Sequence, residues 1–327
     1  MRRFAVTVSA VLVVLLSFAS TATAQSLRRM ARIGMLCAPA CKVSFDEAFL
    51  DELKKIGWVE GTNITIERKD PDYHLDQLPA LASDLVRSKP DLIVAFTPHA
   101  ARAAKNATSD IPIVIALVAD PVGMGLASSL AQPGGNLTGV ATMDRIDFGG
   151  KFLGILREVL PQAKRVAVFL NTLNEMHRLV FPETPAAAAK LGFQLDVFDL
   201  REAGEVPRAI AAAKAQRAEA LDIFSDPIFS FPSNRVPDLA VQAGLPSISF
   251  DLDFARAGGL ISYGPDFLAL ARIGARYVDR ILKGAKTAEL PIEQPTKYLL
   301  VINLKTAKSL GIEIPANVLA RADEVIE

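Results

Sequence analysis

The chain has 327 residues, with 36 basic and 36 acidic side chains, so its formal net charge at pH 7 is zero. This balance gives no support for nucleic-acid binding, which usually requires a basic surface, and the chain has no polybasic tail for a membrane. Without its first 24 residues it keeps about 300, a length that suits two lobes of about 150 residues better than one core.

The first 24 residues predict a secretory signal peptide. Arg2 and Arg3 form a positive start, residues 4–18 are apolar, and a small-x-small sequence ends at Ala24, so we expect cleavage before Gln25. The apolar run is shorter than the roughly 20 residues of a membrane-spanning helix. No cysteine follows the cleavage point to carry a lipid. A twin-arginine signal is the alternative, but the strongly apolar segment favours general secretion, and hence the periplasm.

Cys37 and Cys41 are the two cysteines of the chain. An oxidising compartment makes a disulfide between them plausible, with free thiols as the alternative. The bridge would close a very short loop and add little stability. Two cysteines cannot complete a zinc site, and His74, His99 and His177 show no ligand spacing. We expect no metal and no cofactor.

Apolar strand patterns alternate with helical periodicity along almost the whole chain. In the first half we predict strands at 31–36, 63–69, 91–96, 111–118 and 137–141, and helices at 44–56, 75–87 and 98–107. In the second half we predict helices at 148–160, 186–191, 206–217, 236–243 and 267–282, and strands at 165–170, 193–198, 220–224, 246–250, 258–263 and 298–302. Two short helices are expected to close the chain.

Strand–helix alternation of this kind is typical of an α/β fold with right-handed βαβ units and mostly parallel sheets covered on both faces. The chain contains two such series of similar size, with a junction near residues 140–145. We therefore predict two similar lobes. Because ligands bind beyond the carboxyl ends of parallel strands, the cleft between the lobes is the expected site.

Eight segments, in order, resemble one family of bacterial proteins. They are Gly57-Trp58-Val59-Glu60-Gly61-Thr62-Asn63-Ile64, Asp91-Leu92-Ile93-Val94-Ala95 with Thr97-Pro98, Ile111-Pro112-Ile113-Val114, Asp120-Pro121-Val122-Gly123, Pro133-Gly134-Gly135-Asn136-Leu137-Thr138-Gly139, Gly258-Gly259-Leu260-Ile261-Ser262-Tyr263-Gly264, Leu290-Pro291 with Glu293-Gln294-Pro295-Thr296, and Asn303-Leu304-Lys305-Thr306-Ala307. The family is that of the ABC transporter substrate-binding proteins related to the bacterial tryptophan and tyrosine importers. The resemblance covers nearly all of the chain after residue 24.

The resemblance implies the type I periplasmic-binding-protein fold, in which two Rossmann-like lobes with parallel sheets are joined by a three-crossover hinge. On that pattern the first lobe comprises 25–142 plus about 264–290, and the second about 143–263 plus 291–327. It also implies a function: a non-enzymatic, monomeric binding protein that captures a small organic molecule for an inner-membrane ABC permease. The ligand class is an amino acid, aromatic in some relatives, or another small carboxylate.

The predicted helix that begins after Thr97 is the leading candidate for ligand binding. Its first backbone N–H groups have no partner within the helix and carry partial positive charge, so they can receive a carboxylate. Thr97, Pro98 and His99 would lie at this end. Thr97 can bind the ligand, cap the helix, or do both.

Polar residues at the ends of predicted strands are the next candidates. Asp226 and Asp251 are placed to meet an ammonium or hydroxyl group, and Asn171 offers both a donor and an acceptor. Asp120 also follows a strand, but bracing the Pro121 turn is its favoured role.

Other candidates are an aromatic residue and the first loop. Tyr263 either stacks on a ligand or packs at the hinge. Leu36 and Cys37 begin a loop, 36–42, that should reach the cleft. Phe224, Phe229 and Phe231 are expected to pack in the core or in loops rather than to surround a ligand.

Glycines near the predicted crossovers are hinge candidates. Gly139, Gly258 and Gly259 would permit the backbone rotation that lobe closure needs. Ordinary tight-turn geometry is the alternative at each of them.

Two other functions compete with transport. The sequence contains no P-loop, no G-x-S-x-G motif and no G-x-G-x-x-G motif after the first strand, so a secreted enzyme is disfavoured. Gly123-Met124-Gly125 is only a fragment of the last motif. A sensory protein that presents its ligand to a membrane receptor would have the same site, so the residues do not separate it from an importer subunit.

Overall fold

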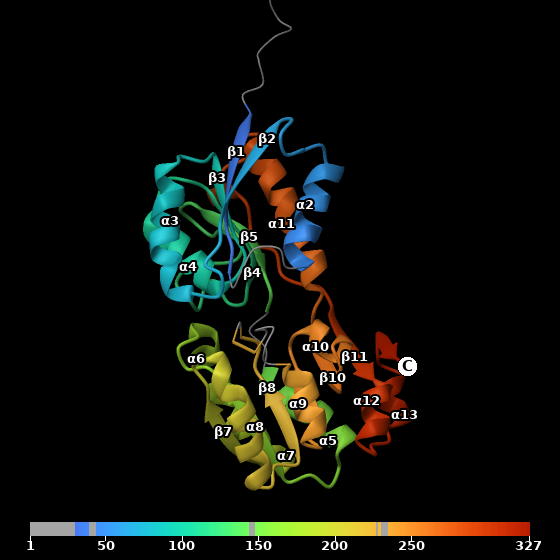
Figure 1. Ribbon diagram of the computed structural model, residues 1–327. Coiled ribbons are helices and arrows are strands. Elements are labelled where there is room, and N and C mark those ends of the chain that lie inside the picture. Colours follow the sequence, from blue (N-terminus) through green and yellow to red (C-terminus); the bar gives the residue numbers. More distant parts are fainter. Residues whose placement is uncertain (1–29, 39–43, 144–147, 227, 230–234) are drawn as a thin grey trace, which may run out of the picture.

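A computed structural model describes residues 30–38, 44–143, 148–226, 228–229 and 235–327. The expected signal peptide, residues 1–24, lies outside the described residues. The described chain forms two α/β lobes, one above the other in Figure 1, and each lobe is built on its own sheet.

The first lobe contains a five-stranded sheet in the order β2-β1-β3-β4-β5, and every pair of neighbouring strands is parallel. Its elements are β1 (Ala31–Leu36), α2 (Ser44–Lys55), β2 (Ile64–Lys69), η1 (Leu75–Gln77), α3 (Leu78–Arg87), β3 (Leu92–Ala95), α4 (Pro98–Ala107), β4 (Ile113–Val118) and β5 (Leu137–Ala141). All residues of β3, β4 and β5 are buried, as expected for parallel strands with helices on both faces.

A helix from late in the sequence completes this lobe. The helix α11 (Phe267–Leu282) lies beside α2 on one face of the sheet, opposite α3 and α4 (Figure 1). Leu270 and Tyr277 of α11 share a buried cluster with Phe49 and Leu53 of α2. The short η4 (Thr287–Glu289) contacts β5.

The second lobe contains a seven-stranded sheet in the order β12-β11-β10-β9-β8-β6-β7. Its elements are α5 (Phe148–Val159), β6 (Arg165–Leu170), α6 (Glu175–Val180), η2 (Phe181–Glu183), α7 (Thr184–Leu191), β7 (Gln194–Asp199), η3 (Ala203–Glu205), α8 (Val206–Ala215), β8 (Ala220–Ile223), α9 (Val236–Gln242), β9 (Ser247–Ser249), α10 (Leu252–Arg256), β10 (Ile261–Pro265), β11 (Tyr298–Asn303), α12 (Leu304–Ser309), α13 (Ala316–Leu319) and β12 (Glu324–Ile326). β11 runs antiparallel to β10, and the other neighbouring strands pair in parallel.

The alternation of strands and helices is confirmed, and three elements depart from the sequence prediction. The helix α6 forms in a stretch for which no helix was predicted. The helix α10 lies between two strands that were predicted to follow each other directly. The chain ends on β12 instead of a helix.

The described chain passes between the sheets three times: after β5, after β10 and after η4. Two of these crossovers are hydrogen-bonded side by side. The Glu293 N–H donates to the Gly139 carbonyl at 2.9 Å, and the Ala141 N–H donates to the Glu293 carbonyl at 2.8 Å. Gly139 lies in this pair with a φ of 134°, and a Cβ there would lie 2.0 Å from the Ile115 carbonyl oxygen.

The other two predicted hinge glycines lie elsewhere. Gly258 and Gly259 form the turn between α10 and β10, at the end of β10 that is remote from its crossover. Gly258 has a φ of 109°, and a Cβ on Gly259 would meet the Phe254 ring at 2.1 Å, so tight-turn geometry accounts for both. At the crossover itself stands Gly264, where a Cβ would lie 2.0 Å from the Phe250 carbonyl oxygen.

Replacing Gly139 by alanine tests this crossover. We expect Gly139→Ala to lower the free energy of unfolding by more than the ~1–3 kcal/mol of one strained backbone position, because the added Cβ also meets the β4 backbone. Gly154→Ala in α5 is the matched control, since no atom lies within 4 Å of its new Cβ; it should be neutral or stabilising by up to ~1 kcal/mol. Denaturant unfolding of both variants measures the difference. Equal stability of the two variants would contradict the close approach of β5 and β4.

Candidate functional site

A cavity of about 610 Å³ lies between the lobes. Its walls come from the start of α4, the ends of β4 and β5 and the start of α11 in the first lobe. The second lobe contributes α5, α6 and the segments that follow β8 and β9. Since parallel strands present their carboxyl ends at one edge of a sheet, the two sheets face each other across this cavity.

The start of α4 is the polar element of the first-lobe wall. Thr97 is the N-cap, and its Oγ1 accepts a hydrogen bond from the Ala100 N–H at 3.5 Å. Pro98 has no N–H, so the first backbone donor of the helix belongs to His99. Thr97, Pro98 and His99 all line the cavity. This end of α4 carries the partial positive charge of the helix dipole and can receive an anionic group.

The Asp226 carboxylate is the polar element of the second-lobe wall. It follows β8, lines the cavity and is 2% exposed. Its Oδ2 accepts from the Nδ2 of Asn174 at 2.8 Å and of Asn171 at 3.4 Å, and its Oδ1 accepts from the Ile228 N–H at 3.0 Å. All three donors are neutral. A carboxylate held by neutral donors has no cationic partner among them, so it can bind a cationic group in the cavity.

His177 fixes the position of this network and also lines the cavity. Its Nδ1 accepts from the Asn171 N–H at 2.8 Å, so the proton is on Nε2, which donates to the Ser225 carbonyl at 3.0 Å. Burial lowers the pKa of His177, so the ring is neutral. The ring therefore joins the end of β6 to the segment that carries Asp226.

His99 and Asp251 are the other titratable residues of interest on the cavity wall. Burial lowers the pKa of His99, against the opposing charges of Asp226 and Glu175. Desolvation by the surrounding protein raises the pKa of Asp251 to about 6. Asp251 also caps α10, because its Oδ1 accepts from the Asp253 N–H at 3.0 Å.

Aromatic side chains from both lobes form much of the remaining wall. The first lobe supplies Phe45 and Phe267, and the second supplies Phe152, Phe224 and Phe250. Phe250 and Phe267 meet across the lobes, with ring centroids 5.7 Å apart. Tyr73 and Phe229 also line the cavity. Phe224 and Phe229 therefore line the cavity in addition to packing internally, and Phe231, for which the same packing was expected, lies outside the described residues.

No group of three or more His, Cys, Asp or Glu side chains in the described ranges is placed to hold a metal ion. Nor does any helix of those ranges have the length and apolar character needed to cross a bilayer.

The comparison with protein families matches residues 35–326 to the ABC transporter substrate-binding proteins. The chain belongs to this family. Its members bind small molecules, work with ABC permeases and are not enzymes, and they are typically extracellular or periplasmic. The two lobes are accordingly those of a type I periplasmic binding protein.

Three proteins with known ligands or structures are similar to this substrate-binding protein. It is 28% identical to a tyrosine-binding protein of Clostridioides difficile (strain R20291), over 83% of this chain and 78% of the relative. The crystal structure of an ABC domain in complex with L-Trp from Streptococcus pneumonia is 25% identical, with a TM-score of 0.82 over 90% of this chain and 99% of that chain. A ligand-free, open substrate-binding protein from Clostridium difficile is 27% identical, with a TM-score of 0.65 and the same coverage.

Five of the predicted site residues of this substrate-binding protein line the cavity. They are Thr97, Pro98, His99, Asp226 and Asp251. Asn171 lies one layer behind, where it donates to Asp226.

The remaining predicted residues have other roles. Leu36 is completely buried in the first-lobe core, because it is the last residue of β1 and faces the sheet interior. Asp120 accepts from the Gly123 N–H at 2.8 Å and so braces the turn. Tyr263 packs edge-on against Phe152 and beside Tyr298. None of the three lines the cavity.

Cys37 is buried and disulfide-bonded, and it does not line the cavity. Cys41 lies outside the described residues, as do residues 39–42 of the predicted ligand loop. The Cys37–Cys41 pairing therefore remains an expectation from the sequence.

The functional residues that the sequence did not indicate come mainly from one segment. Asn174, Met176 and His177 stand at the start of α6 and line the cavity. The available signal was Asn174 itself, since asparagine followed by an acidic residue is typical of a helix start; its Oδ1 accepts from the Met176 N–H at 2.9 Å.

Asp222 is a buried acid of β8 that faces away from the cavity. Among the described residues neither of its carboxyl oxygens has a hydrogen-bond partner, and burial raises its pKa to about 8. The unfolded chain loses this proton near the ordinary value of 3.8, whereas the folded chain keeps it up to about pH 8. The contribution of Asp222 to stability is therefore present at low pH and is lost as the pH rises from about 4 to 8.

Asp222→Asn removes this titration. We expect the variant to be more stable than the original chain at pH 7.5, and to show a smaller loss of stability between pH 5 and 7.5. The difference is bounded by ~1.4 kcal/mol per pH unit. Denaturant unfolding at the two pH values measures it, with Asp110→Asn, an exposed position, as the control. An unchanged pH dependence in Asp222→Asn would show that Asp222 is ionised in the folded protein.

Proposed function

We propose that this chain is the solute-binding subunit of an ABC importer and that it binds an aromatic L-amino acid between its lobes. One observation carries the proposal: the buried Asp226 carboxylate and the start of α4 line the same cavity from opposite lobes. The first can pair with an α-ammonium group and the second with an α-carboxylate. The aromatic wall is suited to a ring side chain.

The comparisons support the same ligand class. One relative is a tyrosine-binding protein, and a second was solved with L-Trp. The lobe arrangement is also informative, since identity is nearly equal for the L-Trp complex and the ligand-free, open protein while the TM-scores are 0.82 and 0.65. The structure of this chain is thus closer to the ligand-bound arrangement than to the open one.

The proposed cycle follows from the two-lobe geometry. A ligand held by both lobes binds the closed form more tightly than the open form, so it shifts the equilibrium toward closure. The closed form is the one that the permease would recognise. We further propose that residues 1–24 direct the chain to the periplasm, that they are removed before Gln25, and that the mature protein acts as a monomer without a cofactor.

Calorimetry with a set of matched ligands tests the binding proposal. L-Tryptophan and L-tyrosine should bind. Tryptamine, which lacks the carboxylate, and indole-3-propionate, which lacks the ammonium group, should each bind at least about tenfold more weakly, because each leaves one charged partner unfilled. Absence of heat with all the aromatic amino acids, together with no rise in melting temperature, would overturn the assignment of ligand class.

Asp226→Asn tests the role of the carboxylate. The variant should bind L-tryptophan at least about tenfold more weakly, as expected for the loss of a charged hydrogen bond. Its affinity for indole-3-propionate should stay nearly unchanged. Asp222→Asn is the matched control, because Asp222 is a buried acid of β8, the strand that Asp226 follows, but does not line the cavity. If both variants lost equal affinity, the effect would be structural and Asp226 would not be the ammonium partner.

A further inference from the structure

The start of α6 is a point where the second lobe touches both the ligand cavity and the first lobe. Asn174 donates to Asp226 at 2.8 Å. Met176 is buried in the hydrophobic cluster of the first lobe. Because consecutive helical residues point about 100° apart, this single turn can make contacts in several directions.

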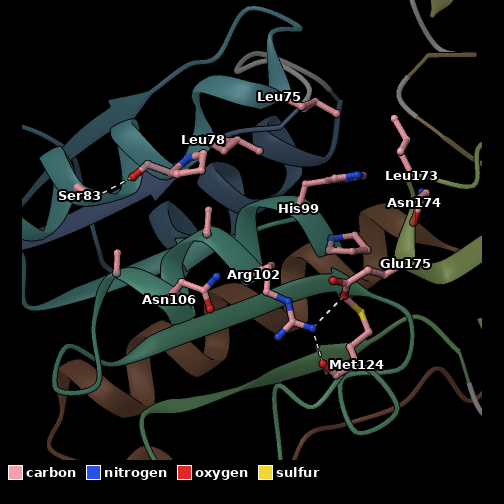
Figure 2. A pocket seen from close by; sticks show the side chains of 14 residues that line it. Leu75, Leu78, Ser83, His99, Arg102, Asn106, Met124, Leu173, Asn174 and Glu175 are labelled. Atoms are coloured by element: carbon pink, nitrogen blue, oxygen red, sulfur yellow. Dashed lines mark hydrogen bonds and ion pairs between the residues drawn. The ribbon is translucent and has the colours of Figure 1, made fainter. Parts of the chain in front are cut away.

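Glu175 makes the charged contact of this turn. Its Oε2 accepts from the Nη2 of Arg102, on α4 of the first lobe, at 2.9 Å. Figure 2 shows this ion pair and the second bond that Arg102 donates, to the Met124 carbonyl of its own lobe. Arg102 lies one turn after Pro98 on α4. The first turn of α4 therefore faces the ligand cavity, and its second turn contacts the second lobe through Arg102.

Open space lies beside the ion pair. A second cavity, of about 330 Å³, is bounded by α3 and α4 on one side and by residues 173–175 on the other (Figure 2). The side chains of Arg102 and Glu175 are 32% and 37% exposed. Separation of the two would therefore leave neither side chain fully buried, although the Nε of Arg102 is itself buried, and partly exposed ion pairs form and break at low cost.

Neither member of the pair lines the ligand cavity, whereas their neighbours do. His99 and Asn174 border both cavities. His99 is three residues before Arg102, and Asn174 is adjacent to Glu175. The ion pair thus joins positions close in sequence to two residues that line the ligand cavity from different lobes.

We propose that Arg102 and Glu175 are positioning residues for ligand binding. Their ion pair holds the first turn of α6 against α4 in the closed form, and so places Asn174 and Asp226 opposite the start of α4. The proposal rests on the proposed function for the identity of the ligand, but the coupling of the pair to closure does not depend on that identity.

The test compares charge-neutral and charge-exchanged variants, with L-tryptophan as the probe. Glu175→Gln and Arg102→Gln should each raise the dissociation constant about two- to fivefold, the range of a partly exposed ion pair. The increase should appear in the dissociation rate and shrink at high salt. The double exchange Arg102→Glu with Glu175→Arg restores an ion pair and should bind L-tryptophan more tightly than either single exchange. Glu60→Gln is the matched control, since it removes the Arg68–Glu60 pair within the first lobe at similar exposure, and it should change nothing.

A measurement without ligand separates this proposal from the ligand assignment. Small-angle scattering of the ligand-free protein at low salt should give a larger radius of gyration for Glu175→Arg, where two like charges oppose closure, than for the original chain. The added exchange Arg102→Glu should reverse the change. One outcome is that the radius of gyration changes with the charges as expected while L-tryptophan binds none of the variants. That result would support the role of the ion pair in closure and would contradict the proposed ligand. Identical scattering curves for all three chains, or equal dissociation constants for the original chain and Glu175→Gln, overturn the proposal.

Discussion

The buried negative charge of Asp226 is the constraint around which the site is arranged. A carboxylate that is 2% exposed requires hydrogen-bond donors, and it has the amides of Asn171 and Asn174 and the Ile228 N–H. Each amide is fixed in turn. Asn174 caps α6, and Asn171 is held through its backbone by the neutral ring of His177. Neutral donors stabilise the carboxylate without cancelling its charge, so that charge remains available to a cationic ligand group.

Across the cavity from Asp226, the first lobe presents the N-terminus of α4 and, among the described residues, no lysine or arginine side chain. The start of α4 offers backbone donors whose direction is fixed by the helix, and the Thr97 cap and Pro98 hold that end in one conformation. A lysine or arginine at the same place would pair with Asp226 as the lobes close and exclude the ligand. Partial charge on backbone amides avoids that competition, because the helix end cannot move across the cavity.

The sequence was sufficient to predict the fold, and five of its candidate site residues line the cavity between the lobes. Buried strands and amphipathic helices leave strong periodic signals, and Thr97, Asp226 and Asp251 are recognisable because each follows a strand at the edge where ligands bind. Leu36 and Tyr263 do not line the cavity, because which face of its strand a side chain occupies depends on the neighbouring elements. The helix α6 was missed because six residues give less than two turns of periodicity, with Pro182 close behind. Its stability comes from the Asn174 cap and from contacts with the other lobe, which no local pattern records.

The contacts between the lobes are individually weak, and this weakness suits a protein that must release its ligand. The Arg102–Glu175 pair is partly exposed, a class worth ~0.2–1 kcal/mol. The Phe250–Phe267 contact adds ~0.5–1.5 kcal/mol, the range for a pair of aromatic side chains. Together with the burial of Met176 in the first-lobe cluster, they bias the lobes toward closure. The deciding contribution must come from a molecule that contacts Asp226 and α4 at once, because only such a molecule has a different affinity for the two arrangements.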